Sequence, residues 1–165
     1  MQLYLVRHGL AIDRTDPACP ADPARPLTPK GEARTRQVAR GLAEIGIRPQ
    51  VMMTSPLLRA VQTAEIFCEV LGCTVSRLRR TDNLMPDSKP AALLGELARM
   101  KVRDLMCFGH APNLDVVIAA SSGRGQTFTQ MKKSAVALLE IESFEPPRAL
   151  LRWLYNPRIL RRLGR

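Results

Sequence analysis

The chain has 165 residues, of which 45% are hydrophobic and 24% charged, a balance typical of one globular domain over residues 1–165. No apolar run approaches the ~20 residues that a membrane span needs, so no contact with a membrane is expected. The net charge of +10 favours anionic partners, but only 4% of the residues are aromatic and no nucleic-acid motif occurs. A nucleic-acid partner is therefore not expected.

The first part of the chain passes from a strand pattern through a loop to a helix pattern. Residues 3–6 are a short apolar run that predicts a strand buried on both faces. Residues 13–26 contain four prolines and predict a long loop. A helix is expected over residues 29–45, because Thr28 can cap its start and Pro29 suits the first helical position.

The rest of the chain continues the alternation. A buried strand is predicted over residues 51–54, followed by a helix over residues 56–71 with Ser55 as its N-cap. The remaining elements are helices at residues 90–100 and 113–121 and strands at residues 105–108, 135–141 and 150–155. Strands that alternate with helices indicate an α/β domain with a largely parallel sheet.

The N-terminal segment indicates the cellular compartment of the protein, which in turn sets the expected redox state of its cysteines. Met1 leads into a strand pattern without the layout of a signal peptide, which favours a cytoplasmic location. The cysteines show no C-x-x-C spacing, and in that compartment we expect them to be reduced core residues or bystanders. They are Cys19, Cys68, Cys73 and Cys107. The arginine-rich segment from about residue 156 is expected to be a solvated tail.

Only two histidines occur, and each directly follows an apolar run. His8 and His110 therefore lie where predicted strands end, and the carboxyl ends of parallel strands share the sheet edge at which α/β folds bind ligands. Arg7 shares this edge. Arg59 lies in the first turn of the helix after residues 51–54, and a helix N-terminus favours anions. Two histidines and two arginines at one edge predict a phosphate site.

Three segments around these residues resemble the signature segments of the histidine phosphatase superfamily, in the same order and with the same separations. They are LVRHG at residues 5–9, TSPLLRAVQTAEI at residues 54–66 and GHAPNL at residues 109–114. RPLTPKGEAR at residues 25–34 and KKSAVALLEI at residues 132–141 are similar to its SixA-like phosphohistidine phosphatase branch. The resemblance implies a phosphoglycerate mutase-like fold, a three-layer α/β/α sandwich; it is weakest over residues 77–101 and after residue 144.

The resemblance also implies how the site works. His8 would attack phosphorus through one ring nitrogen while the other donates to a backbone carbonyl, and water would hydrolyse the resulting phosphohistidine. Arg7, Arg59 and His110 would hold the phosphoryl oxygens and stabilise the transferring group, so neither a metal ion nor another cofactor is expected. The cations should also disfavour protonation of His8 near neutral pH.

Four further residues are weaker candidates. The resemblance places Arg25 at the mouth of the phosphate pocket, where Asp22 would orient it or act in proton transfer. The alternative is that Arg25 is an exposed loop arginine and that Asp22 only favours a turn. Lys132 and Lys133 are expected in an exposed turn before a strand, with phosphate binding as the alternative.

Asn83 marks a departure from the family pattern. Many members carry an acidic residue as general acid in a context that resembles DNLMP at residues 82–86, and here Asn83 occupies that place. An amide cannot donate the proton that a leaving alkoxide needs, whereas imidazole leaves readily because its conjugate acid has a pKa of about 6.5. The missing acid favours phosphohistidine substrates, unless Asp82 or Asp87 replaces it.

These features predict a metal-independent phosphatase with a phosphohistidine-bearing protein as its partner. Within the same chemistry, the alternative is a phosphatase for a small phosphorylated metabolite, an ester or anhydride such as a sugar phosphate or nucleotide. From another class, the alternative is a non-catalytic module that binds phosphate or nucleic acid. His8 argues against that module, because capture needs cations and not a neutral nucleophile. The sequence predicts no oligomeric state.

Overall fold

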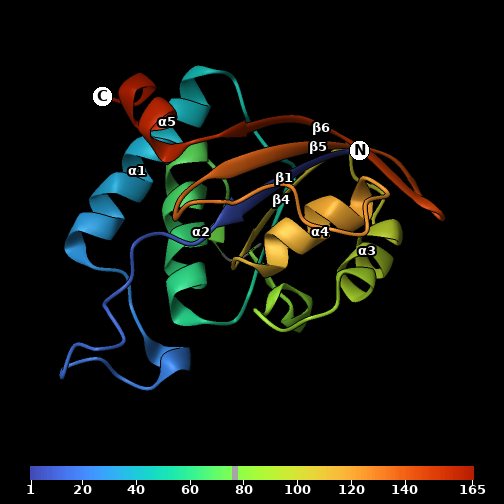
Figure 1. Cartoon of the computed structure of the whole chain (residues 1–165). Helices are drawn as coiled ribbons and strands as arrows, with labels where there is room; N and C mark the ends of the chain where they lie inside the picture. Colours follow the sequence, from blue (N-terminus) through green and yellow to red (C-terminus); the bar gives the residue numbers. More distant parts are fainter. Residues whose placement is uncertain (76–77) are drawn as a thin grey trace.

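The computed structural model describes residues 1–75 and 78–165, and in this part of the chain six strands form one sheet (Figure 1). The strands are β1 (Gln2–Arg7), β2 (Val51–Thr54), β3 (Arg79–Arg80), β4 (Asp104–Gly109), β5 (Val136–Phe144) and β6 (Pro147–Tyr155). Their order is β3-β2-β4-β1-β5-β6, with parallel pairing from β3 to β1 and an antiparallel hairpin of β5 and β6 at the other edge. The prediction of a largely parallel sheet is confirmed.

Helices cover both faces of the sheet. They are α1 (Pro29–Glu44), α2 (Leu58–Leu71), α3 (Pro90–Ala98), α4 (Asn113–Ser121) and α5 (Pro157–Leu163), with short 3-10 helices at Asp22–Ala24 and Asp82–Leu84. Helices α1, α2 and α5 pack on one face and α3 and α4 on the other (Figure 1). In β1, Tyr4 and Val6 point into the first layer and Leu3 and Leu5 into the second, so the strand is buried on both faces as predicted. No helix in the described ranges has the length and apolarity to cross a membrane.

The starts of the two long helices differ in how well they were predicted. Helix α1 begins as expected, with Pro29 in its first turn and Thr28 Oγ1 accepting a hydrogen bond of 3.0 Å from the Gly31 amide. Helix α2 begins only at Leu58, and its N-cap, Leu57, makes no side-chain hydrogen bond. The prediction of Ser55 as the cap is wrong, because its backbone amide still donates to Phe108 at 2.9 Å, beyond the end of the β2–β4 pairing.

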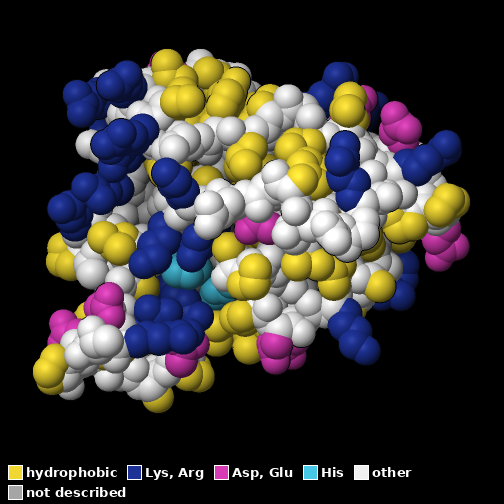
Figure 2. All heavy atoms as spheres, in the orientation of Figure 1, with side chains coloured by type: hydrophobic (Ala, Val, Ile, Leu, Met, Phe, Trp, Pro, Cys, Tyr) yellow, Lys and Arg dark blue, Asp and Glu magenta, His cyan; other side chains and the backbone are white. Residues whose placement is uncertain are grey.

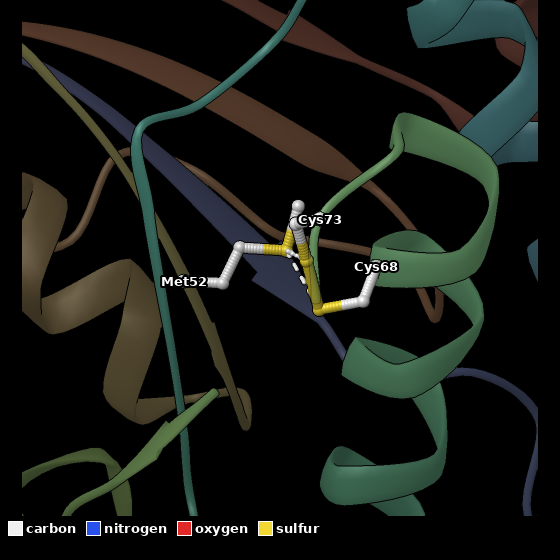
Figure 3. Close-up of a disulfide and its surroundings, with 3 residues drawn as sticks. All are labelled: Met52, Cys68 and Cys73. Carbon is white, nitrogen blue, oxygen red and sulfur yellow. Dashed lines mark hydrogen bonds between the residues drawn. A yellow bond between two sulfur atoms is a disulfide. The ribbon is translucent and has the colours of Figure 1, made fainter. Parts of the chain in front are cut away.

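The prediction of four reduced cysteines is also wrong, because Cys68 and Cys73 form a disulfide (Figure 3). Helix α2 ends at Gly72, whose positive φ of 76° reverses the chain, and the Cys73 amide then donates to the Cys68 carbonyl at 2.9 Å. This turn brings the two Cα atoms to 4.6 Å, a distance that suits a disulfide. The Sδ atom of Met52 packs against the pair, 3.4 Å from the Cys68 Sγ atom.

The arginine-rich end of the chain is an ordered helix rather than a solvated tail. Asn156 caps α5, its Oδ1 accepting from the Arg158 amide at 3.0 Å. The backbone of α5 lies directly against α1, so that a side-chain carbon added at Gly41 would collide with the Leu160 carbonyl, and one added at Gly164 with that of Gln37. Two glycines therefore allow α5 to dock, which explains why the solvated-tail prediction is wrong.

Candidate active site

The carboxyl ends of three parallel strands bring the predicted residues together. Arg7 is the last residue of β1 and His8 follows it. His110 follows β4, and Arg59 lies in the first turn of α2, after β2. The ring centroids of His8 and His110 are 5.1 Å apart. His8 is 6% exposed and both Arg59 and His110 are 2% exposed, and Figure 2 shows the two histidines in a recess between basic side chains. The shared sheet edge is as expected, while the catalytic roles of these residues remain predictions.

His8 is held in one orientation by its own backbone. Its Nδ1 atom lies 2.7 Å from the Gly9 carbonyl oxygen, which can only accept, so Nδ1 carries the proton and Nε2 has a free lone pair. The Gly9 amide donates to Thr63 Oγ1 at 3.0 Å, and that hydroxyl donates to the Arg59 carbonyl at 2.7 Å. Thr63 thus connects the loop of His8 with the helix of Arg59.

Both histidines are neutral near neutral pH. Burial is the largest cause that lowers the pKa of His8, to about 2, and His110, Arg59 and Arg7 act in the same direction. Burial likewise lowers the pKa of His110 to about 3, with help from Arg59. The arginines therefore lower the pKa of His8, as expected, but the removal of the ring from water lowers it more.

These lowered pKa values predict that the protein loses stability in mild acid. The unfolded histidines bind protons below their ordinary pKa of about 6.5 while the folded ones stay neutral, so protons favour the unfolded state. We expect the free energy of unfolding to fall by about 2 kcal/mol for the two histidines between pH 7 and pH 5.5. Urea unfolding at both pH values measures this loss, and the His8→Gln/His110→Gln variant should lack most of it. An equal loss in that variant would assign the effect to other groups.

His110 has a partner that the sequence did not indicate. Its Nε2 atom lies 2.9 Å from the hydroxyl of Ser55, which also accepts from the Leu57 amide at 3.3 Å. The Nδ1 atom of His110 is buried and has no hydrogen-bond partner among the described residues. Ser55 therefore orients the ring and leaves one nitrogen for a ligand.

Arg7 is positioned by a chain of contacts from helix α4. Its Nη1 atom donates to the Met131 carbonyl at 2.6 Å. The buried Asp115 holds this segment, because its Oδ1 atom accepts from the Met131 amide at 2.9 Å and from the Thr129 hydroxyl at 2.7 Å. The Nε atom of Arg7 is buried without a partner in the described part of the chain, so it remains available to an anion.

Asp22 gathers three arginines in the loop before α1. Its carboxylate lies 3.2 Å from Arg59, 3.2 Å from Arg25 and 3.1 Å from Arg14. Burial tends to raise the pKa of Asp22, but the arginines outweigh it and lower that pKa, so the carboxylate is ionised. This geometry favours an orienting role over proton transfer.

Arg25 is not an exposed loop arginine, and that alternative is wrong. The residue is 8% exposed, and its Nη1 atom donates to the Ile12 carbonyl at 2.9 Å.

The side chain of Asn83 is hydrogen-bonded to helix α3. Its amide donates at 2.7 Å to Glu96 Oε2, which also accepts from the Thr81 hydroxyl at 2.7 Å. Asp82 and Asp87, the two carboxyl groups that could replace a missing general acid, are exposed. The structure therefore lends no support to a substitute acid from this loop.

Comparison with known proteins places the chain among relatives of varied activity. The sequence of residues 3–84 matches the family model of the histidine phosphatase superfamily (branch 1). An uncharacterized protein of Picosynechococcus sp. is 38% identical over 141 residues, which cover 82% of each chain. A 2,3-bisphosphoglycerate-dependent phosphoglycerate mutase of Thermobifida fusca is 43% identical over 70 residues, 42% of this chain and 28% of the mutase.

The solved structures extend the likeness over nearly the whole chain. The protein histidine phosphatase SixA complexed with tungstate has a TM-score of 0.83 at 28% identity, over 97% of this chain and 99% of SixA. The mycobacterial glucosyl-3-phosphoglycerate phosphatase Rv2419c, with a TM-score of 0.69 at 17% identity over 92% and 96% of the two chains, shares the fold. The order of the motifs, the topology of the sheet and the similar proteins all indicate the same family. The chain belongs to the histidine phosphatase superfamily.

Proposed function

We propose that this protein hydrolyses phosphohistidine in proteins through a covalent intermediate on His8 and without a metal ion. The observation that carries the proposal is the neutral His8 ring, whose Nδ1 donates to the Gly9 carbonyl at 2.7 Å and whose Nε2 lone pair is free. The likeness to SixA supports the substrate class, because that protein is a protein histidine phosphatase. Its tungstate is a tetrahedral oxyanion, as phosphate is.

In the proposed reaction, each of these residues has its own step. The Nε2 lone pair of His8 forms a bond to phosphorus while the bond between phosphorus and the substrate imidazole breaks, and the electron pair stays on that imidazole. Arg7 and Arg59 bind the phosphoryl oxygens with their guanidinium groups, and His110 contributes its unpaired Nδ1 atom. Water then attacks phosphorus, releases inorganic phosphate and restores His8.

The surroundings of the leaving group favour phosphoramidates over alkyl esters. An alkoxide needs a proton as it leaves, whereas a phosphorylated imidazole can leave as a neutral ring once it has taken up a proton from water. Asn83 is committed to Glu96, and Asp22 is held ionised by its arginines. Neither residue supplies a proton to an alkoxide.

The test compares three substrates in the presence of EDTA: a phosphohistidine-bearing protein, p-nitrophenyl phosphate and a sugar phosphate. We expect phosphohistidine to be hydrolysed with a kcat/KM at least about a hundredfold above that of the sugar phosphate, the size of a typical general-acid contribution. EDTA should leave the rate unchanged. Preference for the sugar phosphate would replace the proposal with a small-ester phosphatase, and loss of activity in EDTA would contradict metal-free catalysis.

A further inference from the structure

Next to the histidines, the surface continues as a groove lined by cations. Two adjoining hollows of about 330 and 490 Å³ share Arg34, Lys132, Pro157 and Arg161 in their walls, and the larger one adds Arg158. We call this surface the cationic groove; its basic residues are Arg34, Lys132, Lys133, Arg158 and Arg161. Figure 2 shows basic side chains following one another from the end of the chain to the two histidines.

The docking of α5 on α1 creates this groove. Arg34 lies on α1, Lys132 and Lys133 precede β5, and Arg158 and Arg161 lie on α5, so three distant parts of the sequence contribute. The glycines at the contact of α1 and α5 let the backbones touch, which fixes the arginines of the last helix beside that of α1. The basic C-terminal residues are therefore part of a built surface.

The cations of the groove are not neutralised by the protein itself. Within residues 1–75 and 78–165, no carboxylate lies within 4 Å of a side-chain nitrogen of these five residues, whereas Arg14, Arg25 and Arg59 all pair with Asp22. Burial and then Arg7 and Arg25 lower the pKa of Lys133, although Asp13 opposes them. Gathering like charges in this way is unfavourable, and a bound anion would relieve it.

The groove is continuous with the candidate active site. Arg7, the residue before His8, lines the smaller hollow together with Lys133. A ligand whose phosphoryl group lies at His8 can therefore extend past Arg7 toward α5. Five cations in two successive hollows exceed what one additional phosphate group needs and suit several anionic groups in a row.

We propose that the cationic groove binds acidic side chains around the phosphorylated histidine of a protein substrate. The proposal rests on the proposed function and adds a rule for choosing among phosphohistidine proteins: those with carboxylates beside the modified residue are preferred. Electrostatic attraction of this kind raises the association rate and weakens as salt screens the charges.

The test uses two phosphohistidine peptides that differ only in having glutamate or glutamine around the phosphorylated residue. We expect the native chain to prefer the glutamate peptide about tenfold or more in kcat/KM at low salt, and to lose this preference as NaCl is added. The Arg34→Glu/Arg158→Glu variant should abolish the preference. The matched control, Arg99→Glu/Arg103→Glu, makes the same charge change at exposed residues in the connection between α3 and β4, outside the groove, and should retain the preference.

Three results would overturn the proposal. The first is equal kcat/KM for both peptides in the native chain, and the second is an equal loss of preference in both variants. The third is a kcat/KM that falls in Arg34→Glu/Arg158→Glu when a sugar bisphosphate is the substrate but not when either peptide is.

If the native chain hydrolyses no phosphohistidine peptide, the proposed function fails. The groove proposal is then tested separately, by the dissociation constants of the two unphosphorylated peptides. Equal affinities would overturn the groove proposal. Tighter binding of the glutamate peptide that is lost in Arg34→Glu/Arg158→Glu would support it.

Discussion

Replacing His8 by alanine is expected to lower kcat for phosphohistidine by at least about 10⁴-fold, because the covalent route is lost with its nucleophile. The substitution removes the ring whose Nε2 atom carries the free lone pair and leaves the guanidinium groups of Arg7 and Arg59 unchanged. Rapid quenching after mixing with a ³²P-labelled substrate measures the intermediate directly. The native chain should carry an acid-labile label that resists alkali, as phosphohistidine does, and His8→Ala should carry none.

His110→Ala is the matched control for this experiment, since it removes a second buried imidazole from the same recess. The Nε2 atom of His110 lies 2.9 Å from the Ser55 hydroxyl. When that hydroxyl donates to Nε2, the proton of the neutral ring is on Nδ1, so the proposed role of His110 is to donate and not to attack. We expect the label to form in His110→Ala, but more slowly by about 10² to 10³, the cost of removing one donor to the transferring group. If His8→Ala carried the label and His110→Ala carried none, His110 would be the nucleophile and His8 the donor. Unchanged binding of tungstate by His8→Ala, with no label in the native chain, would indicate a binding module.

The arrangement of the main elements could be predicted because burial on two faces leaves a clear pattern. Leu3 and Leu5 face one helix layer and Tyr4 and Val6 face the other. Residues 3–6 are therefore all apolar, and such a continuous apolar run predicts a buried parallel strand. Strand β3 was not predicted, because the two exposed arginines at residues 79–80 carry no apolar pattern. The start of α2 was misplaced because Ser55 resembles a cap, and local sequence does not reveal that its hydroxyl faces a histidine 55 positions away.

The convergence of the site followed from topology, while its supporting contacts did not. Residues that end parallel strands must share an edge, which brings His8 to His110. The link from Asp115 through Met131 to Arg7 depends on how a loop packs on α4, and no local motif marks it. The disulfide was missed for a related reason: the left-handed turn at Gly72 brings together cysteines whose spacing has no redox signature.

Replacing Arg59 by lysine is expected to lower kcat/KM by about 10² to 10³ while the chain still folds. Arg59 is 2% exposed, and its Nη atoms reach both the Asp22 carbonyl at 3.0 Å and the Asp22 carboxylate at 3.2 Å. Lysine keeps the charge but presents a single ammonium group, which cannot hold Asp22 and a phosphoryl oxygen with the planar geometry of a guanidinium. Steady-state kinetics and tungstate binding measure the loss, and thermal unfolding verifies the fold.

Arg36→Lys is the control that separates geometry from charge. Arg36 also forms a salt bridge, to Glu69 at 2.7 Å, but the Arg36 side chain is 36% exposed and the Glu69 side chain 63% exposed. Exposed pairs of this kind contribute at most about 1 kcal/mol, so Arg36→Lys should leave kcat/KM unchanged. If Arg59→Lys retained full activity, charge alone would suffice at this position and the guanidinium would serve only to hold Asp22. If the Asp22→Asn variant lost as much activity as Arg59→Lys, the effect of Arg59 would be traced to the orientation that Asp22 imposes on it and not to contact with the phosphoryl group.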